Sequence, residues 1–200
     1  MWAGDFQLSC PAGMPFLLNN SDTWTCLDDK TIKELDKLQV LFLSVLLSVP
    51  TSTPRPAIFF DTGSITMELE IMKRKLNLIQ HIKNLDDNCL AKEIYNEQIR
   101  NNWPGLTKEC EEFCEFLKIP NVITTEMTKG AWKNKVKQAI REKNSQNLKD
   151  KMEKYSKLEE MRLEEKCELK SYFSDMTMEE ARTHFRIRSK MISCKFKQQK

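Results

Sequence analysis

The segment Phe59–Leu76, FFDTGSITMELEIMKRKL, decides which fold the chain adopts. Its first six residues match the catalytic loop of an aspartic protease, in which apolar residues lead into Asp-Thr-Gly-Ser. That enzyme class needs two carboxylates that share one proton, and β-strands on both sides of the loop. The chain contains one Asp-Thr-Gly, and a homodimer would supply the second carboxylate but not the sheet. Because the residues from Met67 onward have helical spacing, we interpret the segment as a connection between helices.

The residues of this connection fit a buried turn followed by a capped helix. The Phe59-Phe60 pair is expected to pack into a helical core, and Gly63 to supply the backbone freedom for the bend. Ser64 or Thr66 would cap the helix that follows. In this interpretation Asp61 has no part in catalysis.

Helix-start signals and apolar spacing predict an all-α protein. Capping boxes open helices at Thr31–Glu34 and Thr177–Glu180, and the only ambiguous strand run is Ala57–Phe60. We expect an irregular bundle of about five to six helices, with a compact first half and an extended, basic helical second half. The other expected helices begin after Ser64, run from Asp87 to Arg100, begin at Thr107, and run from about Thr128 to about Lys170.

Two of these helices have predicted inward faces. In the first helix, which runs towards Pro50, the face consists of Ile32, Leu35, Leu38, Phe42, Val45, Leu46 and Val49. In the helix that ends at Arg100, the expected inward residues are Leu90 and Ile94. Burial of these faces would supply much of the core of the first half.

Charge is distributed unevenly along the 200 residues, although the net charge is only +3. Lys129–Lys157 contains ten Lys and Arg against three acids, and Arg182–Lys200 contains seven against none, so each segment carries +7. The rest of the chain is therefore at −11, and this pattern indicates localised contact with a polyanion. We predict an irregular amino-terminal segment (1–17), a helical domain (18–119) and a basic helical extension (120–200).

The seven cysteines are odd in number and scattered, which is typical of reduced thiols in an intracellular protein, nuclear or cytoplasmic. Cys110 and Cys114 share a helical stripe with Phe113 and Leu117 and have no second ligand pair, so we predict core packing rather than a metal site. No cofactor and no small-molecule substrate are expected. The most apolar run, Leu38–Val49, has twelve residues and is too short to span a bilayer, so no membrane partner is expected.

Two Asp pairs, Asp28-Asp29 and Asp86-Asp87, resemble the box in which polymerases hold two metal ions. That box needs an apolar β-hairpin around it and a third, distant carboxylate. Both pairs here stand just before helical segments, where carboxylates favour the helix amino terminus. We interpret both pairs as helix caps.

Cations on two predicted helices are the main functional signal. Lys129, Lys133, Lys137 and Arg141 recur every four residues and would form a ridge beside an apolar stripe of Trp132, Val136 and Ile140. The acid-free terminal segment combines cations with Phe185 and Phe196. Such cations bind RNA or DNA phosphates with little sequence preference, although a solvated helix face would have the same pattern. The predicted phosphate contacts are Lys133, Lys137, Arg141, Arg186, Arg188 and Lys190.

A different function class stays open beside this one. The segment 128–170 could pair with a partner helix in a helical interaction or scaffold protein, as in a coiled coil. Its heptad signal is weak, since polar residues occupy several of the expected core positions. We therefore give nucleic-acid binding precedence.

A set of short elements occurs in a fixed order along the chain: Trp24, Leu38-Gln39, Pro50–Pro54, Ile58–Ile65, Lys75-Leu76-Asn77 and His81. LKIPNVITTEMTKGAWKNKVKQAI and EEARTHFRIRSKM follow further along. Together they resemble the region just after the reverse transcriptase core in animal non-LTR (LINE-like) retrotransposon polyproteins. The resemblance covers roughly Leu18 to Lys197.

The resemblance implies a truncated, non-catalytic fragment. The parent family is an RNA-directed DNA polymerase, but its catalytic palm would lie before Leu17, and no residue here matches a catalytic position. A zinc-knuckle-like Cys element would follow after Lys200. The fragment would be a helical thumb- or connector-like module that contacts template RNA or target DNA and is not itself an enzyme.

Overall fold

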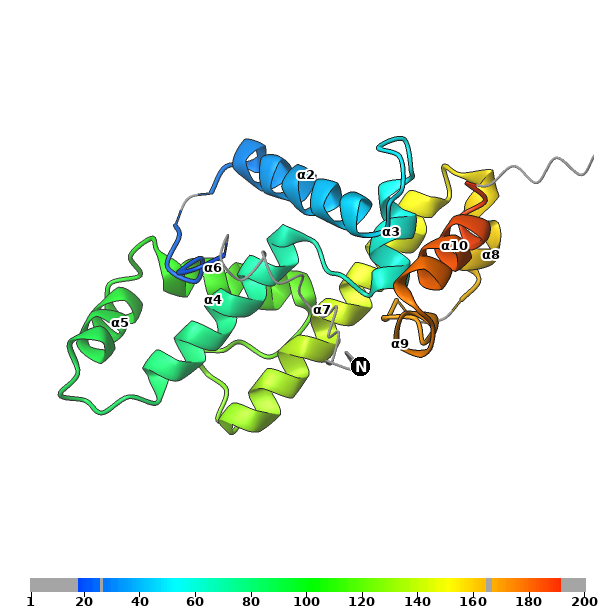
Figure 1. The fold of residues 1–200 in the computed structure, drawn as a ribbon. Coiled ribbons are helices and arrows are strands. Elements are labelled where there is room, and N and C mark those ends of the chain that lie inside the picture. Colours follow the sequence, from blue (N-terminus) through cyan, green and yellow to red (C-terminus); the bar gives the residue numbers. More distant parts are fainter. Residues whose placement is uncertain (1–17, 26, 165–166, 192–200) are drawn as a thin grey trace, which may run out of the picture. The chain divides into compact units, whose positions relative to one another are not determined.

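The computed structural model describes residues 18–25, 27–164 and 167–191, and these residues form an all-α protein (Figure 1). The predicted fold class is confirmed, with nine α-helices among the described residues instead of five to six. The described part of the chain contains one isolated β-bridge, between Thr62 and Leu169, and no strand. The helices are α2 (Asp29–Leu46), α3 (Arg55–Thr62), α4 (Met67–Lys83), α5 (Leu90–Arg100), α6 (Leu106–Leu117), α7 (Lys129–Met152), α8 (Glu159–Arg162), α9 (Tyr172–Asp175) and α10 (Met178–Arg188), with a 3-10 turn, η1 (Ser156–Leu158).

The predicted capping residues are correct for α10, correct in part for α2 and wrong for α5. Thr177 caps α10 in a complete capping box with Glu180, as predicted. At α2 the predicted box at Thr31 is wrong, because the Asp28 carboxylate caps the helix and accepts a hydrogen bond from the Thr31 backbone N–H at 2.8 Å. The hydrogen bond with the Thr31 side chain, and after it this backbone bond, lower the pKa of Asp28, which bears out the capping role of the first Asp pair. At α5 the N-cap is Cys89, so the second Asp pair does not provide the cap.

Two other elements differ from the prediction. Ala57–Phe60, the ambiguous strand run, lies inside α3, which begins at Arg55 with a proline in its first turn, where the missing N–H costs little. The long helix expected over 128–170 ends at Met152. After it the chain forms η1 and α8, and Cys167–Lys170 has no helical structure.

The chain forms two compact units that interleave along the sequence. One unit contains Asp36–Ser64 and the described part of Ser145–Lys200, and the other contains Ile65–Asn144 and the described part of Pro15–Leu35. The domain boundaries predicted from sequence lie after residues 17 and 119 instead. Each unit has its own cluster of buried apolar side chains, and each is described separately below.

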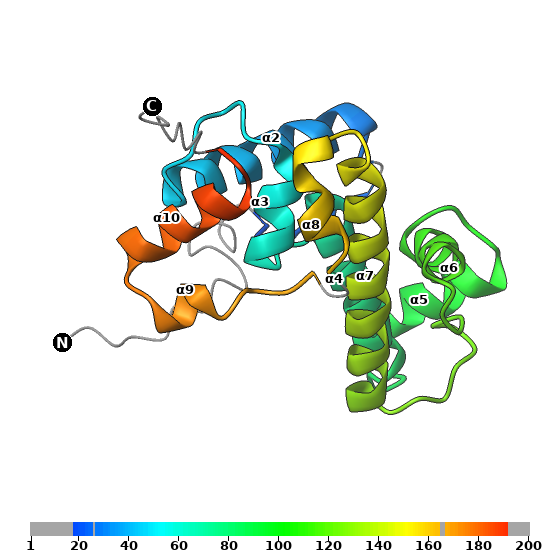
Figure 2. The same cartoon turned by 90° about the vertical axis from the view of Figure 1, so that its right-hand side faces the viewer.

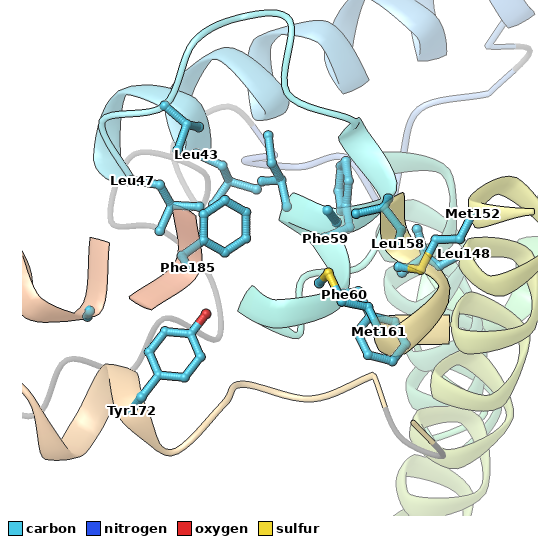
Figure 3. Close-up of a cluster of buried hydrophobic side chains, with 14 residues drawn as sticks. Leu43, Leu47, Phe59, Phe60, Leu148, Met152, Leu158, Met161, Tyr172 and Phe185 are labelled. Atoms are coloured by element: carbon cyan, nitrogen blue, oxygen red, sulfur yellow. The ribbon is translucent and has the colours of Figure 1, made fainter. Parts of the chain in front are cut away.

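In the first unit, α3 lies at the centre of the core. Its residues Ala57, Ile58, Phe59 and Phe60 are all buried, as predicted for the two phenylalanines. Figure 3 shows side chains from other elements on both sides of this helix. Burial of these side chains supplies the main favourable free energy for this unit. The surrounding residues of the cluster include Leu43, Leu47, Leu148, Met152, Leu158, Met161, Tyr172 and Phe185.

In the second unit, α7 packs against α4 and α6. The predicted stripe of Trp132, Val136 and Ile140 is buried, and the Trp132 Nε1–H donates to the Leu76 carbonyl at 3.2 Å. The predicted core packing of Cys110 and Cys114 is confirmed, since both thiols are buried in the same cluster. Burial raises the pKa of both thiols. They are therefore structural side chains rather than reactive ones.

The predicted inward residues of α5 are wrong, and the predicted face of α2 is wrong at three positions, whereas Val49 of that face is buried. Leu38, Phe42 and Val45 are exposed on α2, and Leu90 and Ile94 are exposed on α5. Nine of the twelve residues from 38 to 49 are apolar, so periodicity alone could not select the buried face of α2. On α5 the larger Tyr95 side chain takes the inward position.

Within the described ranges, no helix combines the length and the apolar character that a membrane crossing requires.

Candidate nucleic-acid interface

Helix α7 presents three of the predicted phosphate contacts in one line. Lys133, Lys137 and Arg141 are all exposed, and each directly follows a residue of the buried stripe. Because successive helical residues are about 100° apart, the three cations lie along one flank of that stripe. Figure 2 shows α7 as one uninterrupted helix, so the line is straight.

Among the described residues, the side chains of Lys133, Lys137 and Arg141 are free to bind an external anion. Within the described part of the chain, none of them has a hydrogen-bond or ion-pair partner. The nearest acid along α7, Glu142, accepts a hydrogen bond from the Gln138 side chain at 2.8 Å. The Arg141 guanidinium thus remains available for an external anion.

The other three predicted contacts have internal partners. The Arg186 guanidinium donates to the Ser48 carbonyl, and the Lys190 ammonium pairs with Glu160 at 3.0 Å. Arg188 is held by two carboxylates, which are described next. The structure therefore separates the six predicted residues into an uncommitted row on α7 and an internally bonded set in and just after α10.

The carboxylate of Asp61, from the protease-like motif, is fully buried, with 0% of the residue exposed. Its Oδ2 accepts hydrogen bonds from the Tyr172 hydroxyl and from the Arg188 Nε–H, each at 2.8 Å. Burial raises the pKa of Asp61, and the charge of Arg188 and the hydrogen bond from Tyr172 limit that rise. Asp61 is thus the centre of a buried polar cluster between α3, α9 and α10.

A second carboxylate completes this cluster. Glu164 pairs with the Lys170 ammonium at 2.6 Å and with the Arg188 guanidinium. Burial would raise the pKa of Glu164, but the hydrogen bonds from Lys170 and Arg188 outweigh burial and hold the pKa below its ordinary value. Arg188 therefore bridges the two carboxylates.

Gly63, the glycine of the motif, allows the backbone at Leu169 to pack directly against the end of α3. Gly63 has φ +62°, the left-handed conformation predicted for a bend, and it ends α3. A Cβ at this position would lie 2.4 Å from the Leu169 backbone nitrogen. The Lys170 N–H donates to the Asp61 carbonyl at 3.1 Å beside it. Of the two predicted caps for α4, Thr66 occupies the N-cap position but its side chain makes no capping hydrogen bond, whereas Ser64 accepts a hydrogen bond from the Thr62 hydroxyl.

This arrangement gives the protease-like motif a structural role. An aspartic protease presents two neighbouring aspartates to solvent, whereas the oxygens of Asp61 are buried and already bonded. No group of three or more His, Cys, Asp or Glu side chains that could hold a metal ion occurs among the described residues. Local sequence patterns do not reveal this cluster, because Tyr172 and Arg188 lie more than a hundred positions from Asp61.

No known family model, no curated protein and no solved structure matches the chain. The resemblance to the post-polymerase region of LINE-like polyproteins therefore stays a prediction from the sequence. What can be argued about function comes from the geometry of the residues themselves.

Proposed function

We propose that the row Lys133, Lys137 and Arg141 is a binding surface for the phosphate backbone of RNA or DNA. In this proposal the chain is a non-catalytic helical fragment of a LINE-like retrotransposon polyprotein that holds nucleic acid. One observation carries the proposal: three exposed cations lie in line on one helix, and none has an internal partner among the described residues.

The packing of α7 supports this role. Trp132, Val136 and Ile140 fix the rotation of the helix about its axis, because each is buried in the second unit. The neighbouring cations therefore stay on the solvent side at constant spacing. Phosphates that bind there release counterions and break no internal ion pair, so the binding free energy depends strongly on salt.

The set in and after α10 would contribute less. A phosphate that binds Arg188 must replace hydrogen bonds to Asp61 and Glu164, and leaving the buried Asp61 carboxylate without this partner is costly. Arg186 and Lys190 are also bonded, though in more exposed positions. These three residues remain candidate contacts, each with a smaller expected effect than a residue of the α7 row.

The test is fluorescence anisotropy of a labelled 20-nucleotide single-stranded RNA over a salt series. The triple variant Lys133→Gln, Lys137→Gln, Arg141→Gln should lower the affinity at least about tenfold at low salt and flatten the salt dependence. A matched control, Lys151→Gln, Lys154→Gln, Lys157→Gln, removes three exposed cations from the same basic segment but outside the row. Equal losses in the two triple variants, or binding that does not depend on salt, would refute the proposal.

The alternative of a helical interaction protein has less support. The 128–170 segment that would pair with a partner helix is interrupted after Met152, and the apolar stripe of α7 is already buried. An exposed apolar face does exist on α2, at Leu38, Leu41, Phe42 and Val45, but nothing in the described structure shows what covers it. Concentration-dependent self-association or helix gain, without nucleic-acid binding, would favour this alternative.

A further inference from the structure

We infer that the α7 row takes one strand of nucleic acid and does not straddle the groove of a duplex. This inference rests on the proposed function and specifies the ligand of the same surface. It follows from how charge is arranged around α7, on the row and on the two faces beyond it.

The cations occupy one flank only. On the far face of α7, one step round from the row, the corresponding residues are Asn134, Gln138 and Glu142, which add no positive charge and one carboxylate. A second strand of phosphates placed over this face would be repelled by Glu142.

The opposite flank offers no second row. Its residues are Lys135, Ala139 and Lys143, and Ala139 is buried. The Lys143 ammonium lies 4.2 Å from the centroid of the Phe116 ring, so it is engaged in a cation–π contact. Lys135 is thus the one exposed cation of this flank that has no described internal partner.

The absence of a second cation row on the opposite flank favours single-stranded over duplex nucleic acid as the ligand. A helix in the major groove of a duplex has phosphates on both sides of it, across a groove about 12 Å wide. A four-residue interval advances about 6 Å along a helix, so Lys133 and Arg141 are about 12 Å apart along the axis. One line of this length matches about three phosphates of a single strand.

Contact with bases is expected to be weak. Trp132, the aromatic residue of α7 nearest the row, is buried and cannot stack on a base. The Gln138 amide already donates to Glu142. Binding should therefore follow the number of phosphates rather than the sequence.

The experiment compares 20-nucleotide oligothymidylate with a 20-base-pair duplex, both titrated into the full chain over a salt series. The duplex has the higher charge density, so non-specific attraction alone would favour it. We expect the single strand to bind at least about threefold tighter, with a log–log salt slope of about −2, as three contacts predict.

Single-site variants supply the second readout. Lys137→Gln should weaken binding of the single strand about three- to tenfold, whereas Lys135→Gln, on the opposite flank, should change it less than about twofold. Equal effects of Lys135→Gln and Lys137→Gln, or tighter binding of the duplex, would overturn the single-strand inference. If the duplex is preferred and the row triple variant still abolishes its binding, the proposed function stands without the inference. Binding of neither nucleic acid at low salt would remove both.

Discussion

The Arg188 Nε–H lies 3.1 Å from Oδ1 and 2.8 Å from Oδ2 of Asp61, and so connects residues 127 positions apart in the sequence. Asp61 is fully buried, and the same guanidinium also pairs with Glu164. The Asp61–Arg188 pair therefore ties the end of α3 to the end of α10 within the first unit. Its contribution to stability can be measured separately from any binding of nucleic acid.

Replacing Asp61 should destabilise the protein strongly. Asp61→Ala removes the acceptor for Tyr172 and for Arg188 and leaves both donors in a buried site, which costs about 3–5 kcal/mol. Urea unfolding followed by circular dichroism measures the loss. The control is Glu160→Ala, which breaks only the exposed pair with Lys190 and should cost less than about 1 kcal/mol. Comparable losses in the two variants would show that the buried pair is not a special source of stability.

The lowered pKa of Glu164 makes the free energy of unfolding depend on pH. The pKa of Glu164 is below its ordinary value of 4.5 in the folded protein, so the unfolded chain binds its proton more readily. The stability that Glu164 contributes is therefore complete above about pH 4.5 and is lost as the pH falls through the depressed folded pKa. Chemical unfolding of the wild type and of Glu164→Gln between pH 3 and pH 7 measures it. The difference in unfolding free energy should shrink on acidification, and a difference that stays constant or grows would contradict the assignment.

Gly63 should not tolerate a side chain. Gly63→Ala places a Cβ 2.4 Å from the Leu169 nitrogen and forces an L-residue into a backbone conformation at φ +62°. The left-handed conformation alone costs about 1–2 kcal/mol, and the backbone clash adds to it. Gly130→Ala is the matched control, because its Cβ would meet nothing within 4 Å. Gly130 lies in the first turn of α7, so the change should stabilise by less than the value of about 1 kcal/mol for a helix interior. Thermal unfolding of the two variants should therefore shift in opposite directions, and similar shifts would contradict the packing at Leu169.

Local signals in the sequence predicted several elements correctly. The capping box at Thr177, the bend at Gly63 and the buried stripe of α7 each depend on residues within a few positions of one another. Short-range rules of this kind describe caps, turns and helix faces well. The line of cations on α7 follows from the same periodicity, so this candidate surface was visible in the sequence.

The errors arose where distant contacts decide the outcome. Nothing near Asp61 in the sequence indicates that Tyr172 and Arg188 bind it, although a carboxylate in an apolar run does require some partner. The partners of Arg188 are equally invisible in its local sequence, which is basic and predicts only a phosphate contact. Nine of the twelve residues from Leu38 in α2 to Val49 beyond its end are apolar, and tertiary packing selected Leu43 and Leu47 for the core.

The rotation of α7 about its axis buries Trp132 and exposes the adjacent Lys133, so the two residues should have different effects on stability and on binding. Trp132 is fully buried and its indole N–H donates to the Leu76 carbonyl, whereas the adjacent Lys133 is exposed and has no partner among the described residues. Trp132→Ala should therefore destabilise the protein by about 3–5 kcal/mol, through a cavity and the loss of the indole hydrogen bond. Lys133→Ala should change the free energy of unfolding by less than about 0.5 kcal/mol.

Replacing Lys133 should lower the affinity for nucleic acid more than replacing Trp132 does, the reverse of their effects on stability. With Lys133→Ala, the affinity for single-stranded RNA at low salt should fall about three- to tenfold, because one phosphate contact is lost. Trp132→Phe keeps most of the apolar volume, so the folded variant should bind within about twofold of the wild type while it unfolds at lower urea. Urea unfolding and anisotropy titrations of both variants measure the two effects. If Lys133→Ala destabilised the chain as much as Trp132→Phe, or if Trp132→Phe lost more affinity than Lys133→Ala, the register that places the cations on the solvent side would be wrong.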